Sequence, residues 1–239
     1  MPAAVVLGAR NLGGAIADHL LAEGWQVGAV ARSDDTLERM RSAGALALRA
    51  DAADPGELAG ALRQASEELG GVDLVVNAVS AARPPAGTTT FGGGPVADAT
   101  VEAFRGWTAA VAEQAFVFLS EGARALRAAG GGTLVQVTGG SARRAAPGRG
   151  LWSAGAQATR ALVQAAAQEL RGEGIHAALL IVDATIESPK TEAFTRDVPR
   201  EALADQADVA RAVAYLASQS ARGQTYELQL TPAGERWVP

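Results

Sequence analysis

The sequence predicts a three-layer α/β/α protein built on a doubly wound parallel sheet of seven strands. Short apolar runs alternate with longer amphipathic segments along the whole chain, as they do in strand–helix–strand crossovers. At 3–17 an apolar run meets a glycine-bearing turn and then a helix start, which is typical of phosphate-binding turns. A chain of 239 residues with 48% hydrophobic content is ample for one large core. We therefore expect a single domain over residues 1–239.

Each predicted strand is a short run rich in small and branched apolar residues. In order they are AVVL at 4–7, QVGAVA at 26–31, ALALR at 45–49, LVVN at 74–77, TLVQVT at 133–138, HAALLIV at 176–182 and TYELQL at 225–230. The helices are the longer segments between them, in which apolar residues recur at helical spacing. They are predicted at 14–23, 35–42, 55–69, 101–128, 153–171 and 206–218.

Two long irregular segments interrupt this alternation, at 81–98 and at 183–205. Right-handed crossovers bring the carboxyl ends of parallel strands to one edge of the sheet, where ligands bind. Both segments follow predicted strands on that edge, and long loops in compact domains are commonly functional. We expect them to flank a pocket for a small-molecule substrate or ligand.

Composition excludes several classes of function. The net charge is −5 and the arginines are scattered, which argues against a nucleic-acid partner. No apolar run approaches a membrane span and no signal segment precedes the first strand, so we predict a cytoplasmic protein without a membrane partner. The chain has no cysteine and two histidines, His19 and His176, and no metal site is predicted.

The glycine turn departs from the common dinucleotide-binding pattern. Its glycines are Gly8, Gly13 and Gly14, close to a G-x-x-x-G-x-G spacing whose middle position is Leu12. Such a turn brings backbone N–H groups and the positive end of a helix dipole to a pyrophosphate. Packing of a strand against a helix also favours small residues in a turn of this kind, so the turn alone leaves both interpretations open.

Further motifs follow the turn in order: RADAADP around Asp51, DLVVNAVS at 73–80, GGGTLVQVT before Gly139, WSAGA at 152–156, and VARAVAYLAS followed by GQTYELQL. Together with the turn they resemble the short-chain dehydrogenase/reductase superfamily over nearly the whole chain. The resemblance implies a Rossmann-type NAD(P)-binding domain. It also implies cofactor contacts at the positions Gly8, Arg10, Asn11, Leu12, Gly14, Arg32, Asp51, Ala52, Asn77 and Ala78.

The same resemblance implies a lost catalytic site. The family's tyrosine, lysine and serine positions hold Trp152, Ala156 and Gly139, and its asparagine would fall near Val111. An indole N–H donates a hydrogen bond but does not release its proton at usable pH. The usual tyrosine–lysine mechanism is therefore not available.

Nearby polar residues are candidate substitutes: Thr138, Ser141 and Arg160. Arg160 lies one helical turn past Ala156, but a guanidinium stays protonated and cannot relay protons. The run SARRAAPGRG adds Arg143, Arg144 and Arg149. These arginines belong either to a solvated turn or to a site for an anionic substrate or the cofactor phosphates.

The resemblance favours NADP(H) over NAD(H). Arg32 follows the second strand where NAD-dependent members place an acid, and Arg10 lies in the turn, although Asp34 and Asp35 point the other way. Because the lysine is lost and Leu12 adds a side chain near the pyrophosphate, weak or absent binding stays open as an alternative.

The resemblance implies that the helices at 101–128 and 153–171 form subunit contacts. Here they carry aromatic residues and small residues that allow close helix packing, so we predict a homodimer or homotetramer. Tyr215 is predicted to be a core residue. Three functions remain open: an NADP(H)-dependent oxidoreductase with a non-standard site, a non-catalytic dinucleotide- or ligand-binding homologue acting as sensor or partner subunit, and a non-redox biosynthetic enzyme.

Overall fold

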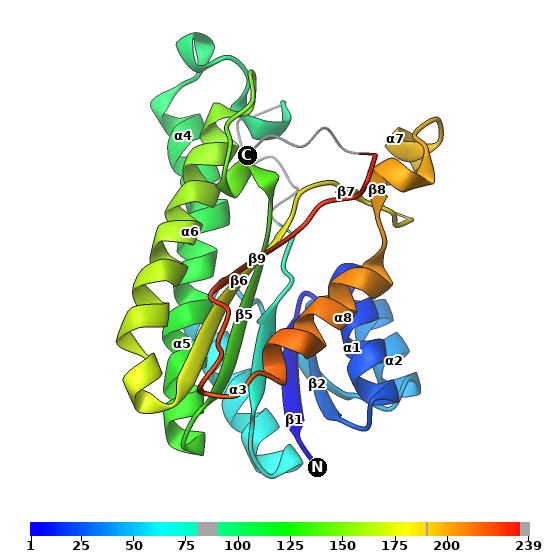
Figure 1. Cartoon of the computed structure of the whole chain (residues 1–239), viewed down its shortest axis with the longest axis vertical. Coiled ribbons are helices and arrows are strands. Elements are labelled where there is room, and N and C mark those ends of the chain that lie inside the picture. The colour runs from blue at the N-terminus through cyan, green and yellow to red at the C-terminus, as the bar shows by residue number, and fades with distance from the viewer. Residues whose placement is uncertain (81–89, 190, 235–239) are drawn as a thin grey trace.

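The structure is a computed structural model that describes residues 1–80, 90–189 and 191–234. A central sheet separates two layers of helices (Figure 1). Its strands are β1 (Ala3–Leu7), β2 (Gln26–Ala31), β3 (Leu46–Arg49), β4 (Leu74–Asn77), β5 (Gly132–Gly139), β6 (Ile175–Val182) and β9 (Glu227–Leu230). The predicted α/β fold with seven strands is confirmed.

Strand order explains where a ligand would bind. The order is β3-β2-β1-β4-β5-β6-β9, and all neighbours are parallel. Leu7 of β1 lies beside Val30 of β2 and Asn77 of β4, and Gly139 of β5 lies beside Val182 of β6. The order reverses between β1 and β4, so a crevice is expected outside the carboxyl ends of these two strands.

The helices bury one face each against the sheet. On one side lie α1 (Leu12–Ala22), α2 (Asp34–Ser42) and α8 (Gln206–Ala217), and on the other lie α3 (Pro55–Leu69), α5 (Gln114–Ala129) and α6 (Gly150–Glu169). Successive strand residues feed opposite cores, as Val5 and Leu7 pack with α3 and α5 while Ala4 and Val6 pack with α1 and α8. This two-sided burial is why the strands are apolar throughout.

The predicted helix at 101–128 is wrong in one respect. It divides into α4 (Val101–Thr108), a π-helical turn (Ala109–Glu113) and α5. The widened turn faces α6, where a Cβ on Gly155 would lie 2.9 Å from the Cβ of Val111, and Thr159 Oγ1 lies 3.5 Å from the Val111 carbonyl oxygen. A tertiary contact thus sets a break that the apolar spacing does not reveal.

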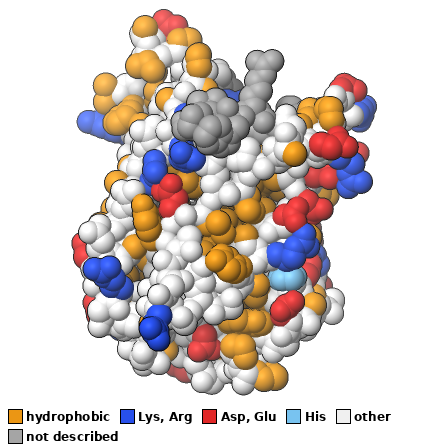
Figure 2. Space-filling view, in the orientation of Figure 1, with side chains coloured by type: hydrophobic (Ala, Val, Ile, Leu, Met, Phe, Trp, Pro, Cys, Tyr) orange, Lys and Arg blue, Asp and Glu red, His pale blue; other side chains and the backbone are white. Residues whose placement is uncertain are grey.

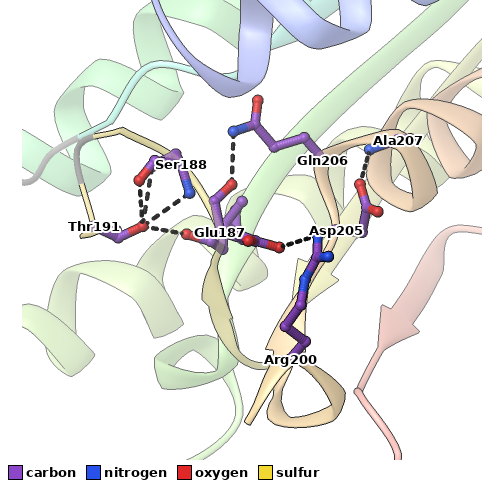
Figure 3. A network of polar contacts seen from close by, with 8 residues as sticks. Glu187, Ser188, Thr191, Arg200, Asp205, Gln206 and Ala207 are labelled. Atoms are coloured by element: carbon purple, nitrogen blue, oxygen red, sulfur yellow. Dashed lines mark hydrogen bonds and ion pairs between the residues drawn. The ribbon is translucent and has the colours of Figure 1, made fainter. Parts of the chain in front are cut away.

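The second irregular segment contains its own secondary structure. Strands β7 (Thr185–Ile186) and β8 (Leu203–Ala204) pair in parallel, and the short helix α7 (Glu192–Thr195) lies between them. Thr191 Oγ1 donates to the Ile186 carbonyl at 2.6 Å, and Gln206 Nε2 donates to the Glu187 carbonyl at 2.7 Å (Figure 3). The segment is therefore fixed to the start of α8. Of the first irregular segment, residues 81–89 lie outside the described residues.

The surface corrects one prediction. Tyr215 is 54% exposed on α8, so its placement in the core was wrong, because the apolar face of this helix is formed by its Val, Ala and Leu residues. Among the described residues, no helix has the length and apolar character to cross a bilayer. Figure 2 shows arginines and acidic side chains intermixed over one face.

Candidate dinucleotide site and predicted catalytic positions

The turn after β1 is tight, and Gly8 is the residue that makes it so. Gly8 has φ +79°, and the N–H groups of Gly8 and Ala9 both donate to the Val30 carbonyl, at 3.1 and 3.3 Å. A Cβ on Gly8 would lie 2.8 Å from Val79 Cα and 2.9 Å from the Ala78 carbonyl oxygen. The turn thus holds the ends of β1, β2 and β4 together and needs glycine for both reasons.

The amino end of α1 lies against this turn. A Cβ on Gly13 would be 2.5 Å from the Gly8 carbonyl oxygen, and one on Gly14 would be 2.7 Å from that of Ala9. Asn11 is the N-cap residue of the helix, and its side chain makes no capping hydrogen bond. Leu12 is half-buried and packs against the apolar cluster of α1 and α8. An uncapped helix start at the edge of the sheet is suited to a phosphate group.

Two predicted cofactor contacts bind each other. Arg32 Nη1 and Asp51 Oδ2 are 2.9 Å apart, with side chains 63% and 39% exposed. The Arg49 guanidinium donates to the Arg32 carbonyl at 2.7 Å and pairs with Asp34. Arg10 is exposed, whereas Ala52, the residue after Asp51, is buried. Because exposed ion pairs contribute little, the Arg32–Asp51 pair can open for a ligand at small cost.

Asn77 lies below the edge rather than on it. Its side chain is fully buried and donates to Gln114 Oε1 at 2.9 Å and to Gln136 Oε1 at 2.8 Å, while its Oδ1 accepts from the Val79 N–H at 3.2 Å. These bonds join β4, β5 and α5. Its neighbour Ala78 contributes backbone, donating from its N–H to the Leu7 carbonyl at 3.1 Å.

Trp152, predicted to occupy the family's tyrosine position, is part of an aromatic cluster. The Trp152 ring lies 4.7 Å from that of Phe91 and 5.6 Å from that of Trp107, and the Arg149 guanidinium lies 5.6 Å from the Phe91 ring. Trp107 is fully buried. The Trp152 ring is therefore held in place by packing against Phe91 and Trp107.

The positions predicted to match the family's lysine and serine carry no polar side chain. Ala156 is 1% exposed on the inner side of α6. Gly139 ends β5, and the one atom of the described residues within 4 Å of an added Cβ is the Val182 carbonyl oxygen, at 3.9 Å. Tyr226 and Tyr215 are both exposed and lie before β9 and within α8, and Lys190 lies outside the described residues.

The structure separates the three candidate substitutes. Thr138 and Ser141 remain half-buried at the carboxyl end of β5. Arg160 binds both carboxylate oxygens of Glu227, at 2.7 and 2.9 Å, and so ties α6 to β9. Bidentate pairs of this kind are strong and directional. This pair holds the Arg160 side chain against β9, at the edge of the sheet.

The sequence interpretation missed Asp183, which immediately follows β6. Its carboxylate lies 3.3 Å from Arg144 Nη2 and 3.3 Å from Gln229 Nε2, and Gln229 also accepts from Arg143. Arg143 and Arg144 of the run at 141–150 thus contact this edge of the sheet. The sequence does show that Asp183 directly follows a buried strand, and this position could have marked it as a candidate. The contact of Asp183 with Gln229 on β9 could not be predicted, because no local sequence pattern indicates it. No group of three potential metal-ligating side chains occurs within the residues that the structure describes.

Comparisons with known proteins agree with this geometry. The family model described as Enoyl-(Acyl carrier protein) reductase matches residues 6–229. The comparison with curated proteins gives no match. Among solved structures, a dehydrogenase/reductase from Sinorhizobium meliloti 1021 is 26% identical, covering 96% of this chain and 93% of that chain with a TM-score of 0.76.

Two further structures share the fold and were solved with cofactors. An alcohol dehydrogenase from the archaeon Thermococcus sibiricus, complexed with 5-hydroxy-NADP, is 23% identical over 100% of both chains with a TM-score of 0.79. An actinorhodin polyketide ketoreductase variant with NADPH is 22% identical over 97% of this chain and 96% of that chain, also with a TM-score of 0.79. Since the family match covers nearly the whole sequence, the resemblance is confirmed, and the chain belongs to the short-chain dehydrogenase/reductase superfamily.

Proposed function

We propose that this protein is an NADP(H)-binding oxidoreductase of the short-chain family that transfers hydride without a tyrosine–lysine pair. The observation that carries the proposal is the uncapped start of α1 on the tight Gly8 turn, at the point where the strand order reverses. The cofactors in the similar structures, 5-hydroxy-NADP and NADPH, support the choice of nicotinamide dinucleotide.

Each part of the site has a distinct role in this proposal. The first turn of α1 binds the pyrophosphate, and Arg32 with Arg10 binds the ribose 2′-phosphate. Bound as NADPH, the nicotinamide dinucleotide would supply the hydride. Trp152 packs beside the acceptor without donating a proton, so the proton comes from water or from the substrate itself.

The missing acid restricts the substrate class. General acid catalysis contributes roughly 10² to 10⁴ in rate, so an unactivated ketone would be reduced slowly here. A conjugated or otherwise polarised acceptor distributes the incoming charge and manages without a protein acid. We therefore assign acceptors of this kind, such as quinones and α,β-unsaturated carbonyls, to the crevice.

Calorimetric titration with NADPH and NADH, followed by NADPH oxidation with a quinone, tests the proposal. Saturable NADPH binding and quinone-dependent oxidation are the expected results. Absence of binding for both nucleotides at millimolar concentration would overturn it. A gain of ketone reduction on combining Trp152→Tyr with Ala156→Lys would give independent support for a productively held cofactor.

The preference for NADPH is expected to depend on Arg32. Arg32 can turn from Asp51 to a bound phosphate at the cost of one exposed ion pair. Replacing Arg32 by alanine removes this guanidinium. We expect NADPH affinity to fall about tenfold and NADH affinity to stay within about twofold, because only NADPH carries the 2′-phosphate. Calorimetry measures both. Arg41→Ala is the matched control, since Arg41 is similarly exposed but pairs with Glu38 on α2; equal losses in the two variants would refute the assignment.

A non-catalytic binding protein is the second candidate. Trp152 packs against Phe91 and Trp107, and Ala156, one helical turn away, is buried. The residues at the family's tyrosine and lysine positions therefore belong to a packed cluster and offer no group for catalysis. In that case NADPH binds but is not oxidised by quinones or enals. Single-turnover oxidation of bound NADPH separates the two candidates.

Self-association is expected through the α4 and α5 stretch. Phe104 and Phe116 are 47% and 56% exposed there, whereas Trp107 and Phe118 are in the core. Exposed aromatic residues are enriched at interfaces, so changing both to glutamate should convert a homodimer or homotetramer into smaller species. Light scattering after gel filtration measures the mass. Tyr215→Glu, an equally exposed aromatic on α8, is the control and should leave the mass unchanged.

A further inference from the structure

Asp183 is the one carboxylate in the described part of the chain that directly follows β6 at the ligand edge of the sheet. Gly139 and Val182 are register partners, so Asp183 lies level with Gly140, just past the end of β5. In doubly wound folds the two halves of the sheet receive the two halves of a dinucleotide. Arg32 and Asp51 lie on the β2 and β3 half, which leaves the ends of β4, β5 and β6 for the nicotinamide half.

The Asp183 carboxylate fills space that a β5 side chain would otherwise occupy. A Cβ on Gly140 would lie 1.8 Å from Asp183 Oδ1. The Asp183 side chain is 13% exposed, so it is mostly desolvated yet reachable. The loss of the family's serine at Gly139 is therefore accompanied by the arrival of a carboxylate from the neighbouring strand.

The partners of Asp183 hold it in place and leave it able to accept more hydrogen bonds. Arg144 and Gln229 approach one oxygen each, both at 3.3 Å, which is long for a charged hydrogen bond. Gln229 is fixed in turn by Thr231, to which its Nε2 donates at 2.8 Å. An ionised carboxylate offers about four lone-pair positions and no donor. A ligand group facing it must therefore donate N–H or O–H.

We propose that Asp183 accepts a hydrogen bond from the carboxamide NH₂ of the nicotinamide and so orients the ring. The inference rests on the proposed function, because it requires the dinucleotide to bind. Asp183 is a positioning residue in this role. Its negative charge makes the site selective for the amide over the corresponding acid, in which a carboxylate would face Asp183.

Three nucleotides distinguish this role from a structural one: NADP⁺, its nicotinic-acid analogue, and 2′-phospho-ADP-ribose, which lacks the ring. For the unmodified protein we expect NADP⁺ to bind at least about tenfold more tightly than the acid analogue, because like charges would meet in a desolvated site. Asp183→Asn should bring this ratio to about one, because an amide can donate to the acid. Affinity for 2′-phospho-ADP-ribose should change less than about twofold. Calorimetry measures all three.

Gly140→Ala is the second variant, since the added methyl group displaces the carboxylate without removing its charge. It should weaken NADP⁺ and spare 2′-phospho-ADP-ribose. Asp197→Asn, an exposed carboxylate on the same segment, is the control and should change nothing. Equal loss of all three nucleotides in Asp183→Asn, or an unchanged amide-to-acid ratio, overturns the inference while the proposed function stands. Failure of the unmodified protein to bind even 2′-phospho-ADP-ribose overturns the proposed function itself.

Discussion

Replacing Asn77 by alanine is expected to lower the free energy of unfolding by about 3–5 kcal/mol, because each buried polar group left without a partner costs about 1–3 kcal/mol. The Asn77 side chain is fully buried and makes hydrogen bonds to Gln114, Gln136 and the Val79 N–H. Gln114 and Gln136 are 7% and 5% exposed, so water does not readily replace the lost partner.

Chemical denaturation monitored by circular dichroism measures this loss, and a melting temperature lower by about 10 °C should accompany it in a domain of this size. Gln64→Ala is the matched control. Gln64 also donates an amide hydrogen bond, to Glu68 at 2.8 Å, but on the exposed face of α3, and its loss should stay within about 0.5 kcal/mol. Similar values for the two variants would show that the buried amide cluster does not stabilise the fold.

The Asn77 cluster also shows where prediction from the sequence stops. The strand ending at Asn77 was predicted with its observed limits, since LVVN is an apolar run buried on both faces. The family resemblance then implies a cofactor contact at Asn77, which stays a prediction. The hydrogen-bond partners of its side chain lie 37 and 59 residues away, and no local pattern signals such a pairing. That side chain joins β4, β5 and α5 in the core.

The same limit applies to the catalytic half of the site. The absence of a tyrosine, lysine and serine at the family's catalytic positions stays a prediction, because it depends on how single positions align with the family. The surroundings of those positions could not be predicted, because Trp152 packs on Phe91 from the first irregular segment and Asp183 contacts Gln229 on β9. Strands and helices follow from local spacing, whereas these contacts follow from the order of strands in the sheet. The short pairing of β7 with β8 was missed for this reason too.

Replacing Gly8 tests whether the turn needs glycine for its backbone conformation alone or also because there is no space for a side chain. Gly8→Ala is expected to lower the free energy of unfolding by about 2–4 kcal/mol, the sum of a left-handed backbone penalty and an overpacking penalty. Its φ is +79°, and the new Cβ would lie 2.8 Å from Val79 Cα, which is backbone and cannot rotate away. Relief of that contact would separate the ends of β1 and β4, where the pyrophosphate is proposed to bind.

Gly24→Ala separates the two penalties, because Gly24 has nearly the same φ, +83°, and no atom of the described residues lies within 4 Å of an added Cβ. This control should lose only the backbone penalty, about 1 kcal/mol, and should bind NADPH as the unmodified protein does. The difference between the two variants measures the close approach of the β1 turn to the chain after β4. If Gly8→Ala is no more destabilising than Gly24→Ala, the turn has room for a side chain, and glycine at position 8 serves only the backbone conformation.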